Sequence, residues 1–532
     1  MDDKKVFPLK QFMIRLFALS LALGILFSGA GPISASAEET EPVQAVELTK
    51  GRIITGFTGF KDISTLCDGY LGWGLRVPAP ASLTMESDLG IGSLYIRFAY
   101  FHGEYTIEDA GTGVSHVWQQ KYLHDFVDLE ALFGYAPTKI TLHFTHDEVT
   151  IYELYAYSPG EVPADVQRWE DPVEGATDII IFSTHGDDEH LFFAGIIPYY
   201  AGELGYQVQM VYMTDHHNND GVTRMREILD GLWAAGMKTY PVFGTFDDFY
   251  RWGIDNAYDT FTALGISRDD LISFVTEQIR RFKPKAVIGH DFNGEYDNGQ
   301  HMVYADVLAA SVEISMDETQ FPESAQKYGT WDVPKAYFHL YEENPIVMDW
   351  DQPLDHFGGK TAWQISKGAL QKHVSQLEAL LKTGWYFGDS WYAAYIGKYS
   401  PCRFGLYRST VGEDVAKNDF FENLTTHAED AVLAEAQRLA EEEAQRQAEE
   451  AARLKAEEEA RQQAEEEARK ASEEAARQES MAQETTAPQP TEAVEEADPI
   501  LSLLAQFWYM PVLAVALLII GMILLRQKGP KK

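Results

Sequence analysis

Cysteine is scarce in this chain: only Cys67 and Cys402 occur among its 532 residues. Two cysteines so far apart exclude a dense disulfide framework and a zinc-finger site, and the sequence leaves open whether they form one disulfide. Stability must therefore come from ordinary hydrophobic cores. A content of 45% hydrophobic and 13% aromatic residues is sufficient to build such cores in a chain of this length.

Basic residues are also few: 43 Lys and Arg residues stand against 82 Asp and Glu residues, which gives a formal net charge of -39. A protein that binds nucleic acid needs a basic surface to neutralise phosphates. The composition therefore predicts no nucleic acid among the partners. Part of the acidic excess lies in one repetitive tract near the C-terminus, so the total charge does not describe the globular part of the chain.

Two apolar runs near the ends of the chain predict export and membrane attachment. Residues 1–37 have the basic start, apolar middle and small-residue end of a signal peptide, with an uncleaved anchor helix as the alternative. Residues 500–525 include an uncharged run long enough to span a bilayer, with a buried soluble helix as the alternative. Four cations in residues 526–532 predict a cytoplasmic tail. We therefore expect a single-pass protein of the cell membrane whose large N-terminal part lies outside the cytoplasm.

A repeat of eight residues fills residues 427–479, with units such as "AEEEAQRQ" and "AEEEARQQ". Pairs such as Glu457 and Arg461 stand four residues apart, which stabilises an exposed helix. The tract has too few large apolar residues for a coiled coil, so a single solvated helix is expected. Residues 480–499 are rich in Pro, Thr and Glu and predict a disordered linker. Together these segments predict a spacer between a globular head and the membrane.

Residues 38–170 have the pattern of an all-β domain. The segments "SLYIRFAYF" and "KITLHFTH" alternate apolar and polar residues, and Gly- and Pro-containing segments separate them. A β-sandwich is the expected architecture. Two roles remain open for it: binding of a glycan, or structural packing against the neighbouring domain.

Residues 171–426 change to an α/β pattern. Short apolar strands, "DIIIF", "QVQMVYMT" and "KAVIGH", alternate with amphipathic helical segments. This alternation predicts a Rossmann-like, mainly parallel sheet with helices on both faces. Ligands of such sheets bind beyond the carboxyl ends of the strands.

Two polar segments occupy that position. "STHGDDEH" follows the first strand and "HDFNGEYDNGQH" follows a later one. Carboxylates crowded at the edge of a buried sheet repel each other, and a bound cation removes that cost. The spacing predicts a metal site with an open position, formed by His185, Asp188 and His301, with Asp187 as a general base. The alternative is a set of helix-capping carboxylates and satisfied surface histidines.

These segments also resemble a known family. "THGDDE" resembles the His-Pro-Asp-Asp-Glu signature of the LmbE-like, N-acetylglucosaminyl-phosphatidylinositol de-N-acetylase family. "RMREILDGLWAAGM" is similar to the Arg-x-x-Glu helix of that family, and "NGEYDNGQH" is similar to its Gly-Glu-Tyr-Gly-His-Pro-Asp-His loop. "FGLYRSTVGEDVAKNDFFENL" is similar to the final segment of bacterial members. The resemblance covers about residues 175–425.

The resemblance implies a zinc-dependent deacetylase that acts on N-acetylated amino sugars. It implies that Asp187 is the general base, that Tyr296 polarises the amide carbonyl, and that Arg224 contacts substrate. The zinc ligands that it implies are His185, Asp188 and His301.

The chain departs from the family pattern at the site itself. Gly186 replaces the proline of the signature, Asp297 replaces a glycine, and Asn298 replaces the first histidine of a His-x-x-His motif. Asn298 can donate a hydrogen bond to an oxyanion but cannot deliver a proton to the leaving amine. Either Asp187 returns the proton that it took, or a neighbour such as His290 delivers it, or activity is reduced.

Other polar residues near the motifs have two interpretations each. Glu189 and His190 either orient the metal ligands or cap the start of a helix. His216 and His217 either line a cleft or belong to a solvated loop, which is the interpretation that we favour. His373 fits a helix, in a structural role or in the site.

Three functions compete. The first is a membrane-anchored extracellular hydrolase that removes acetyl from an N-acetylglucosamine-containing glycan of the cell wall, the capsule or the surroundings. The second is a surface glycan-binding or adhesion protein with a degenerate deacetylase domain, which Asn298 favours and the intact Asp187 opposes. The third is a hydrolase of other bonds such as phosphoesters, and it ranks last because no cluster of cations is available to hold a phosphate.

Overall fold

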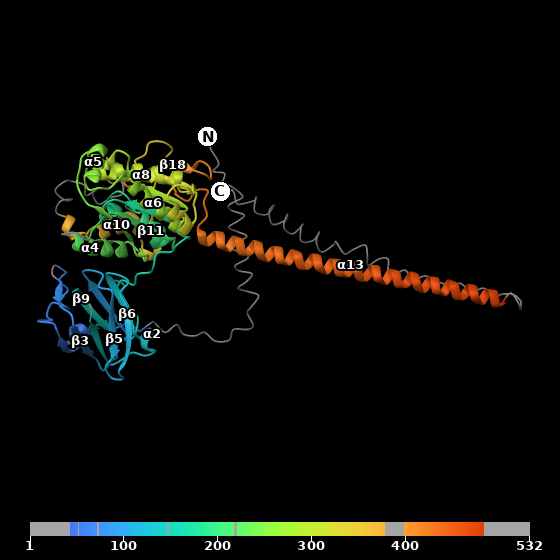
Figure 1. The fold of residues 1–532 in the computed structure, drawn as a ribbon, viewed down its shortest axis with the longest axis horizontal. Coiled ribbons are helices and arrows are strands. Elements are labelled where there is room, and N and C mark those ends of the chain that lie inside the picture. The colour runs from blue at the N-terminus through green and yellow to red at the C-terminus, as the bar shows by residue number, and fades with distance from the viewer. Residues whose placement is uncertain are drawn as a thin grey trace, which may run out of the picture. The chain divides into compact units, whose positions relative to one another are not determined.

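The computed structural model describes residues 43–51, 53–71, 74–145, 148–216, 221–377 and 398–483 (Figure 1). The predicted signal peptide, transmembrane helix and cytoplasmic tail, and most of the predicted linker, lie outside these residues. Within the described ranges, no helix combines the length and the apolar composition that crossing a bilayer requires. The chain divides into two compact units, Met1–Gln437 and Arg438–Lys532.

The N-terminal region forms two antiparallel sheets, as its alternating pattern predicts. One sheet has the order β1-β3-β8-β5-β6. Its strands are β1 (Ile54–Thr58), β3 (Ala81–Glu86), β8 (Lys139–Phe144), β5 (Glu104–Asp109) and β6 (Val114–Gln119). The other sheet has the order β2-β9-β4-β7. Its strands are β2 (Leu75–Val77), β9 (Val149–Tyr157), β4 (Ser93–Phe98) and β7 (His124–Asp128).

The two sheets share one hydrophobic core. Leu83 and Ile107 of the first sheet and Ile96 and Leu154 of the second lie in the same buried cluster. This arrangement is the packing of a β-sandwich. Two short helices, η1 (Thr49–Gly51) and α2 (Leu129–Phe133), accompany the strands.

The two cysteines, both described, do not form a disulfide. The thiol of Cys67 donates to the carbonyl oxygen of Leu154 at 3.3 Å. Cys402 is buried in the core of the following domain instead. Both regions therefore depend on ordinary cores, as the composition indicated.

The following domain contains a seven-stranded sheet with the order β12-β11-β10-β13-β14-β18-β15. The first five strands of this order are parallel to one another, and the last two are antiparallel to their neighbours. The prediction of a mainly parallel sheet is confirmed. The strands are β10 (Ile179–Ser183), β11 (Val208–Asp215), β12 (Val242–Asp247), β13 (Ala286–Gly289), β14 (Lys335–His339), β15 (Pro345–Val347) and β18 (Arg403–Ser409).

Helices cover both faces of this sheet. Ile179 and Ile181 of β10 join a core with α4 and α10, whereas Ile180 and Phe182 join a second core with α5, α6 and α8. Both sides of β10 are therefore buried, which explains its uninterrupted apolar sequence. The longer helices are α4 (Gly221–Ala234), α5 (Ile254–Ala263), α6 (Arg268–Phe282), α8 (Gly299–Ile314), α9 (Pro322–Tyr328) and α10 (Ala362–Leu370). The remaining short elements are α3 (Asp188–Leu191), η2 (Ile197–Glu203), α7 (Gly294–Asp297), η3 (Asp355–Phe357) and a small hairpin of β16 (Pro353–Leu354) and β17 (Lys360–Thr361).

Local signals in the sequence set where α6 begins and ends. At the start of α6, the Ser267 hydroxyl accepts from the Asp270 backbone N–H, and the Asp270 carboxylate accepts from the Ser267 backbone N–H. This reciprocal pair is a capping box. The helix ends at Lys283, which adopts a left-handed conformation before Pro284.

The strand order places the site. The chain runs outward from β10 to β11 and β12, then crosses back to β13 and β14 on the other side of β10. The carboxyl ends of β10 and β13 therefore flank the point at which the order reverses, where ligands of such sheets bind. Both predicted polar segments begin at these two strand ends.

The charged tract forms one long helix, α13 (His427–Gln483), as predicted (Figure 1). Its first turn is tied to the α/β domain, because Asp430 pairs with Lys285. Further along, side chains of the helix pair with each other: Arg461 lies 2.9 Å from Glu458, one residue from the partner that the spacing predicted. Fifty-seven residues correspond to about 85 Å of helix at about 1.5 Å per residue.

Candidate metal centre and catalytic site

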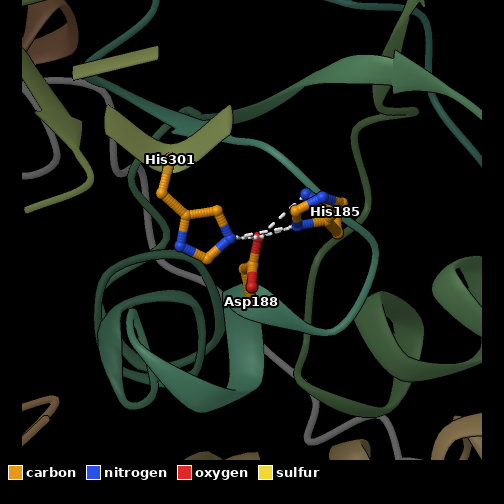
Figure 2. Close-up of side chains that lie close together, drawn as sticks. All are labelled: His185, Asp188 and His301. Atoms are coloured by element: carbon orange, nitrogen blue, oxygen red, sulfur yellow. Dashed lines mark hydrogen bonds and ion pairs between the residues drawn. The ribbon is translucent and has the colours of Figure 1, made fainter. Parts of the chain in front are cut away.

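Three side chains converge at the carboxyl edge of the parallel sheet, and they are the three predicted ligands (Figure 2). His185 Nδ1 lies 3.0 Å from His301 Nε2. Asp188 Oδ2 lies 3.3 Å from His185 Nδ1 and 3.4 Å from His301 Nε2. All three residues are buried.

The turn after β10 and the start of α8 bring these residues together. The His185 backbone N–H donates to Asp188 Oδ2 at 2.8 Å, which closes the turn between β10 and α3. His301 lies in the first turn of α8, which follows β13 through the segment after Gly289. Because β10 and β13 are neighbours in the sheet, residues more than a hundred positions apart meet at one point.

In His185 and His301, the outer ring nitrogen, which is the one facing away from the other ligands, is paired with an oxygen. His301 Nδ1 lies 2.6 Å from Glu295 Oε2, and His185 Nε2 lies 3.3 Å from Gln300 Oε1. These acceptors place the ring protons on the outer nitrogens, so both inner nitrogens present lone pairs to the same point. Glu295 and Gln300 lie within the second predicted polar segment, although no role in the site was predicted for either.

This arrangement fits a divalent transition metal. Two lone pairs 3.0 Å apart beside a carboxylate need a cation between them. The separations of the three ligand atoms resemble the edge of a tetrahedron, roughly 3.3 Å, for metal–ligand bonds of about 2.0–2.2 Å. The electrostatics of the site also favour a cation. Burial alone lowers the pKa of His301, but the Asp188 and Glu295 carboxylates raise it to about 10. The site therefore attracts positive charge.

Glu295 is the centre of a buried network. Its carboxylate contacts His301, His290 at 3.1 Å and His339 at 3.0 Å. Glu295 has a φ of 53°, a left-handed conformation that is unfavourable for a residue with a side chain. His339 lies at the end of β14, and no pattern in the sequence pointed to it.

Asp187 stands at the start of α3 without capping it. Its side chain makes no capping hydrogen bond, which argues against the helix-capping interpretation for this residue. Its backbone has a φ of 157° and a ψ of -25°, an unfavourable combination of the kind found at functional sites. Burial raises the pKa of Asp187 to about 6, against the opposing effect of the Arg224 guanidinium. A carboxylate of this kind can take and return a proton near neutral pH.

Arg224 contacts Asp187 and two residues near it. Its Nη2 donates to the Gly186 carbonyl at 2.9 Å and lies 3.6 Å from Asp187 Oδ1. Its Nη1 donates to Asp248 Oδ2 at 3.0 Å. The guanidinium therefore orients the carboxylate of Asp187.

Asn298 connects Tyr296 to the start of α8. Its Oδ1 accepts from the Gln300 backbone N–H at 2.9 Å and caps the helix, while its Nδ2 donates to the Tyr296 hydroxyl at 2.9 Å. The Tyr296 oxygen accepts this bond, so its own proton is directed elsewhere. Burial raises the pKa of Tyr296, which keeps the hydroxyl protonated.

His290 is not placed to act as an acid. Its Nε2 accepts from the Thr184 backbone N–H at 3.0 Å, so the proton lies on Nδ1, which faces Glu295. Burial also lowers the pKa of His290. The ring is therefore neutral and structurally engaged on both sides.

The surroundings of Gly186 give a local reason for glycine at the position where the family has proline. The Gly186 backbone N–H donates to His216 Nε2 at 3.1 Å, and proline has no such donor. A Cβ at Gly186 would also lie 2.1 Å from Ile228 Cδ1. His216 is buried, so the solvated-loop interpretation is wrong for this residue; His217 lies outside the described residues.

Comparisons with known proteins find curated relatives of this chain. No protein-family model matches the chain. The chain is 25% identical over 188 residues to the 1D-myo-inositol 2-acetamido-2-deoxy-alpha-D-glucopyranoside deacetylase of Rhodococcus jostii strain RHA1, which covers 32% of this chain and 63% of the relative. It is 23% identical over 187 residues to the deacetylase of the same name from Rhodococcus erythropolis, which covers 32% of this chain and 62% of the relative. The chain thus spans a little over three fifths of the length of these curated relatives.

The comparison with solved structures finds, among others, the N,N'-diacetylchitobiose deacetylase from Pyrococcus horikoshii. It has a TM-score of 0.29 and 16% sequence identity, and the similarity covers 39% of this chain and 77% of that chain. The family resemblance predicted from the motifs agrees with the curated relatives. The chain is a distant relative of the LmbE-like, N-acetylglucosaminyl-phosphatidylinositol de-N-acetylase family.

Proposed function

We propose that the α/β domain is a zinc-dependent hydrolase that removes the acetyl group from an N-acetylated amino sugar of a glycan. The observation that carries this proposal is the buried triangle of His185, Asp188 and His301 with the Asp187 carboxylate beside it. The names of the curated relatives agree with a deacetylase of an acetamido sugar. When bound by the three ligands, zinc supplies a Lewis acid for the amide carbonyl and for the attacking water.

Different residues of the chain carry out the separate steps of the proposed reaction. Asp187, oriented by Arg224, takes a proton from the attacking water as the C–O bond forms. The Tyr296 hydroxyl, held by Asn298, donates a hydrogen bond to the developing oxyanion. Arg224 Nε is buried and makes no hydrogen bond to any described residue.

The same carboxyl group completes the reaction. His290 is engaged through both ring nitrogens and Asn298 carries no acidic proton, so Asp187 returns its proton to the leaving nitrogen as the C–N bond breaks. The products are acetate and a free amino sugar. The replacement of the family histidine by Asn298 is thus compatible with turnover.

Exposed aromatic rings beside the site suit a sugar substrate. Tyr250 stacks on Tyr296 with ring centroids 6.2 Å apart and planes 11° apart, and Trp252 meets Tyr250 edge-on at 5.2 Å. Tyr250 and Trp252 are both largely exposed. Flat apolar faces next to polar groups are the surfaces on which sugar rings stack. A glycan chain can therefore rest on these rings while its acetamido group reaches Tyr296.

We further propose that this domain acts outside the cytoplasm, exported by residues 1–37 and anchored by residues 500–525. The support for this location is the sequence pattern of the two segments. The long helix α13 would then separate the catalytic domain from the membrane.

The proposal is tested by acetate release from N-acetylglucosamine oligomers and from cell-wall glycan, with the full chain in detergent. Release is expected with added zinc and is expected to stop with a chelator. If the zinc-loaded protein binds these glycans without releasing acetate, the alternative of a glycan-binding protein with a degenerate domain replaces the proposal.

A further inference from the structure

A second group of metal-binding side chains lies next to the first, and the proposed mechanism does not use it. Glu189, His190 and His373 each offer one ligand atom, and these atoms lie within 4.8 Å of one another. Glu189 and His190 belong to α3, whereas His373 lies just beyond the end of α10. All three are buried, with exposed fractions of 1%, 2% and 0%.

These side chains lack the hydrogen bonds that buried polar groups normally make. Both ring nitrogens of His190, both ring nitrogens of His373 and Oε1 of Glu189 have no hydrogen-bond partner among the described residues. By contrast, both ring nitrogens of His290 and of His339 are hydrogen-bonded. Buried polar groups are nearly always paired, and a cluster of unpaired ones indicates a bound ion or water.

The unpaired atoms face one another. Glu189 Oε1 lies 3.1 Å from His373 Nε2 and 3.6 Å from His190 Nε2, yet neither contact has the geometry of a hydrogen bond. These separations bracket the edge of roughly 3.3 Å expected for three ligands of a tetrahedral ion with bonds of about 2.0–2.2 Å. The other oxygen of this carboxylate accepts from the Asp187 backbone N–H at 2.8 Å, which fixes the orientation of the group.

A glycine of α4 leaves room for the two rings. A Cβ at Gly231 would lie 2.8 Å from His190 Nε2 and 2.9 Å from His373 Nε2. The two nitrogens therefore both lie against this glycine, and any side chain at position 231 would press against both. The absence of a side chain at this point of α4 is a requirement of the cluster.

We propose that Glu189, His190 and His373 bind a second divalent transition-metal ion, zinc being the one whose donor preferences the set matches. Two imidazoles and one carboxylate are ligands that zinc takes in proteins. The ion would tie α3, which carries Asp188, to the end of α10, and would hold the turn that presents Asp187. This role is structural and does not depend on the substrate that the domain uses.

The test counts metal ions. Untagged full chain in detergent is stripped with chelator, reloaded with Zn²⁺ or Co²⁺ and dialysed, and the metal per chain is measured by mass spectrometry. Four variants accompany the wild type: His190→Gln, His373→Gln, Asp188→Asn in the first site, and His124→Gln as a buried histidine of the β-sandwich. Near-ultraviolet circular dichroism establishes that each variant is folded.

Two ions per chain are expected for the wild type and for His124→Gln. One ion is expected for His190→Gln and for His373→Gln, and one for Asp188→Asn, with different cobalt absorption spectra because different sites remain filled. One ion in the wild type that persists in both histidine variants would overturn the proposal. So would two ions whose number is unaffected by either histidine substitution. His190→Gln and His373→Gln test the same site independently, so the outcome is decided even if one of the two variants fails to fold.

Discussion

The Glu295 carboxylate lies 2.6 Å from Nδ1 of His301, and both side chains are fully buried. This contact fixes which nitrogen of His301 faces the other two ligands. Carboxylates in this position orient metal-bound histidines and raise their basicity. The candidate site therefore consists of three ligands and of buried residues, such as Glu295, that orient them.

The first prediction concerns Glu295. Glu295→Gln removes the charge that holds His301 and is expected to weaken zinc affinity by about 10–100-fold. Competition with a fluorescent chelator measures the affinity. Glu313→Gln, at a largely exposed carboxylate, is the matched control. Equal affinity in Glu295→Gln and wild type would contradict the assigned role.

A second prediction distinguishes the two hydrogen bonds of the Asn298 side chain, one with the Gln300 backbone and one with the Tyr296 hydroxyl. Asn298→Asp retains a good N-cap for α8 but turns the donor to Tyr296 into an acceptor, so the tyrosine proton is drawn away from substrate. We expect kcat to fall by about 100-fold, the scale of losing one oxyanion donor, with little change in thermal stability. Asn298→Ala loses the cap as well and is expected to cost about 1 kcal/mol of stability. An unchanged kcat in Asn298→Asp would show that Tyr296 does not act on the oxyanion.

A third prediction concerns the aromatic surface. Trp252→Ala is expected to raise KM for a glycan oligomer about 10-fold while kcat changes little, because the ring contributes to binding before and during the reaction alike. Steady-state kinetics on oligomers of increasing length measure this effect. Leu264→Ala, another exposed apolar residue, serves as the control. A fall in kcat without a change in KM would contradict the proposed role of Trp252.

A fourth prediction addresses the junction between the β-sandwich and the α/β domain. Arg97 Nη2 donates to both oxygens of Asp230 at 2.8 and 2.7 Å, and both side chains are largely buried. Arg97→Ala leaves a buried charge without its partner and is expected to destabilise the protein by about 3 kcal/mol in urea unfolding. Asp171→Asn, which breaks the exposed pair with Lys121, is expected to cost less than about 1 kcal/mol. Similar losses in the two variants would show that the junction does not depend on the buried pair.

A fifth prediction concerns pH. Burial, together with the Arg97 guanidinium, lowers the pKa of His124 to about 3, against the opposing effect of Asp230, while Arg226 also faces it. The unfolded chain therefore binds the proton first, and the stability that the neutral ring contributes is lost as pH falls below about 6.5 toward 3. From pH 7 to pH 5, the wild type is expected to lose about 2 kcal/mol more than His124→Gln. Urea unfolding at both pH values measures this, and equal losses would contradict it.

The sequence predicted the candidate site because both of its polar segments directly follow strands of the parallel sheet. His185, Asp188 and His301 were found because polar residues followed strands of a parallel sheet, and such strand ends meet at one edge. The periodicity of the strands likewise predicted both domains, because alternation and continuous apolar runs report directly on how many faces a strand buries.

The supporting residues escaped prediction for a physical reason. Glu295 and His339 act through contacts between separate strand ends, and their roles depend on backbone conformations that no local pattern encodes. His216 looked solvated because polar residues surround it in sequence, yet its ring is buried against the Gly186 backbone. The unpaired ring nitrogens of His190 and His373 also become visible only in three dimensions.

The most direct test of the central claim is acetate release by the zinc-loaded full chain compared with Asp187→Asn, with bound zinc measured in both samples. Asparagine keeps the size of the side chain and removes its capacity to accept and return the proton. We expect zinc-dependent release by the wild type, and a loss of at least about 100-fold in the variant at equal zinc content. Equal release by the two proteins would contradict the account, because Asp187 would then have no part in the chemistry.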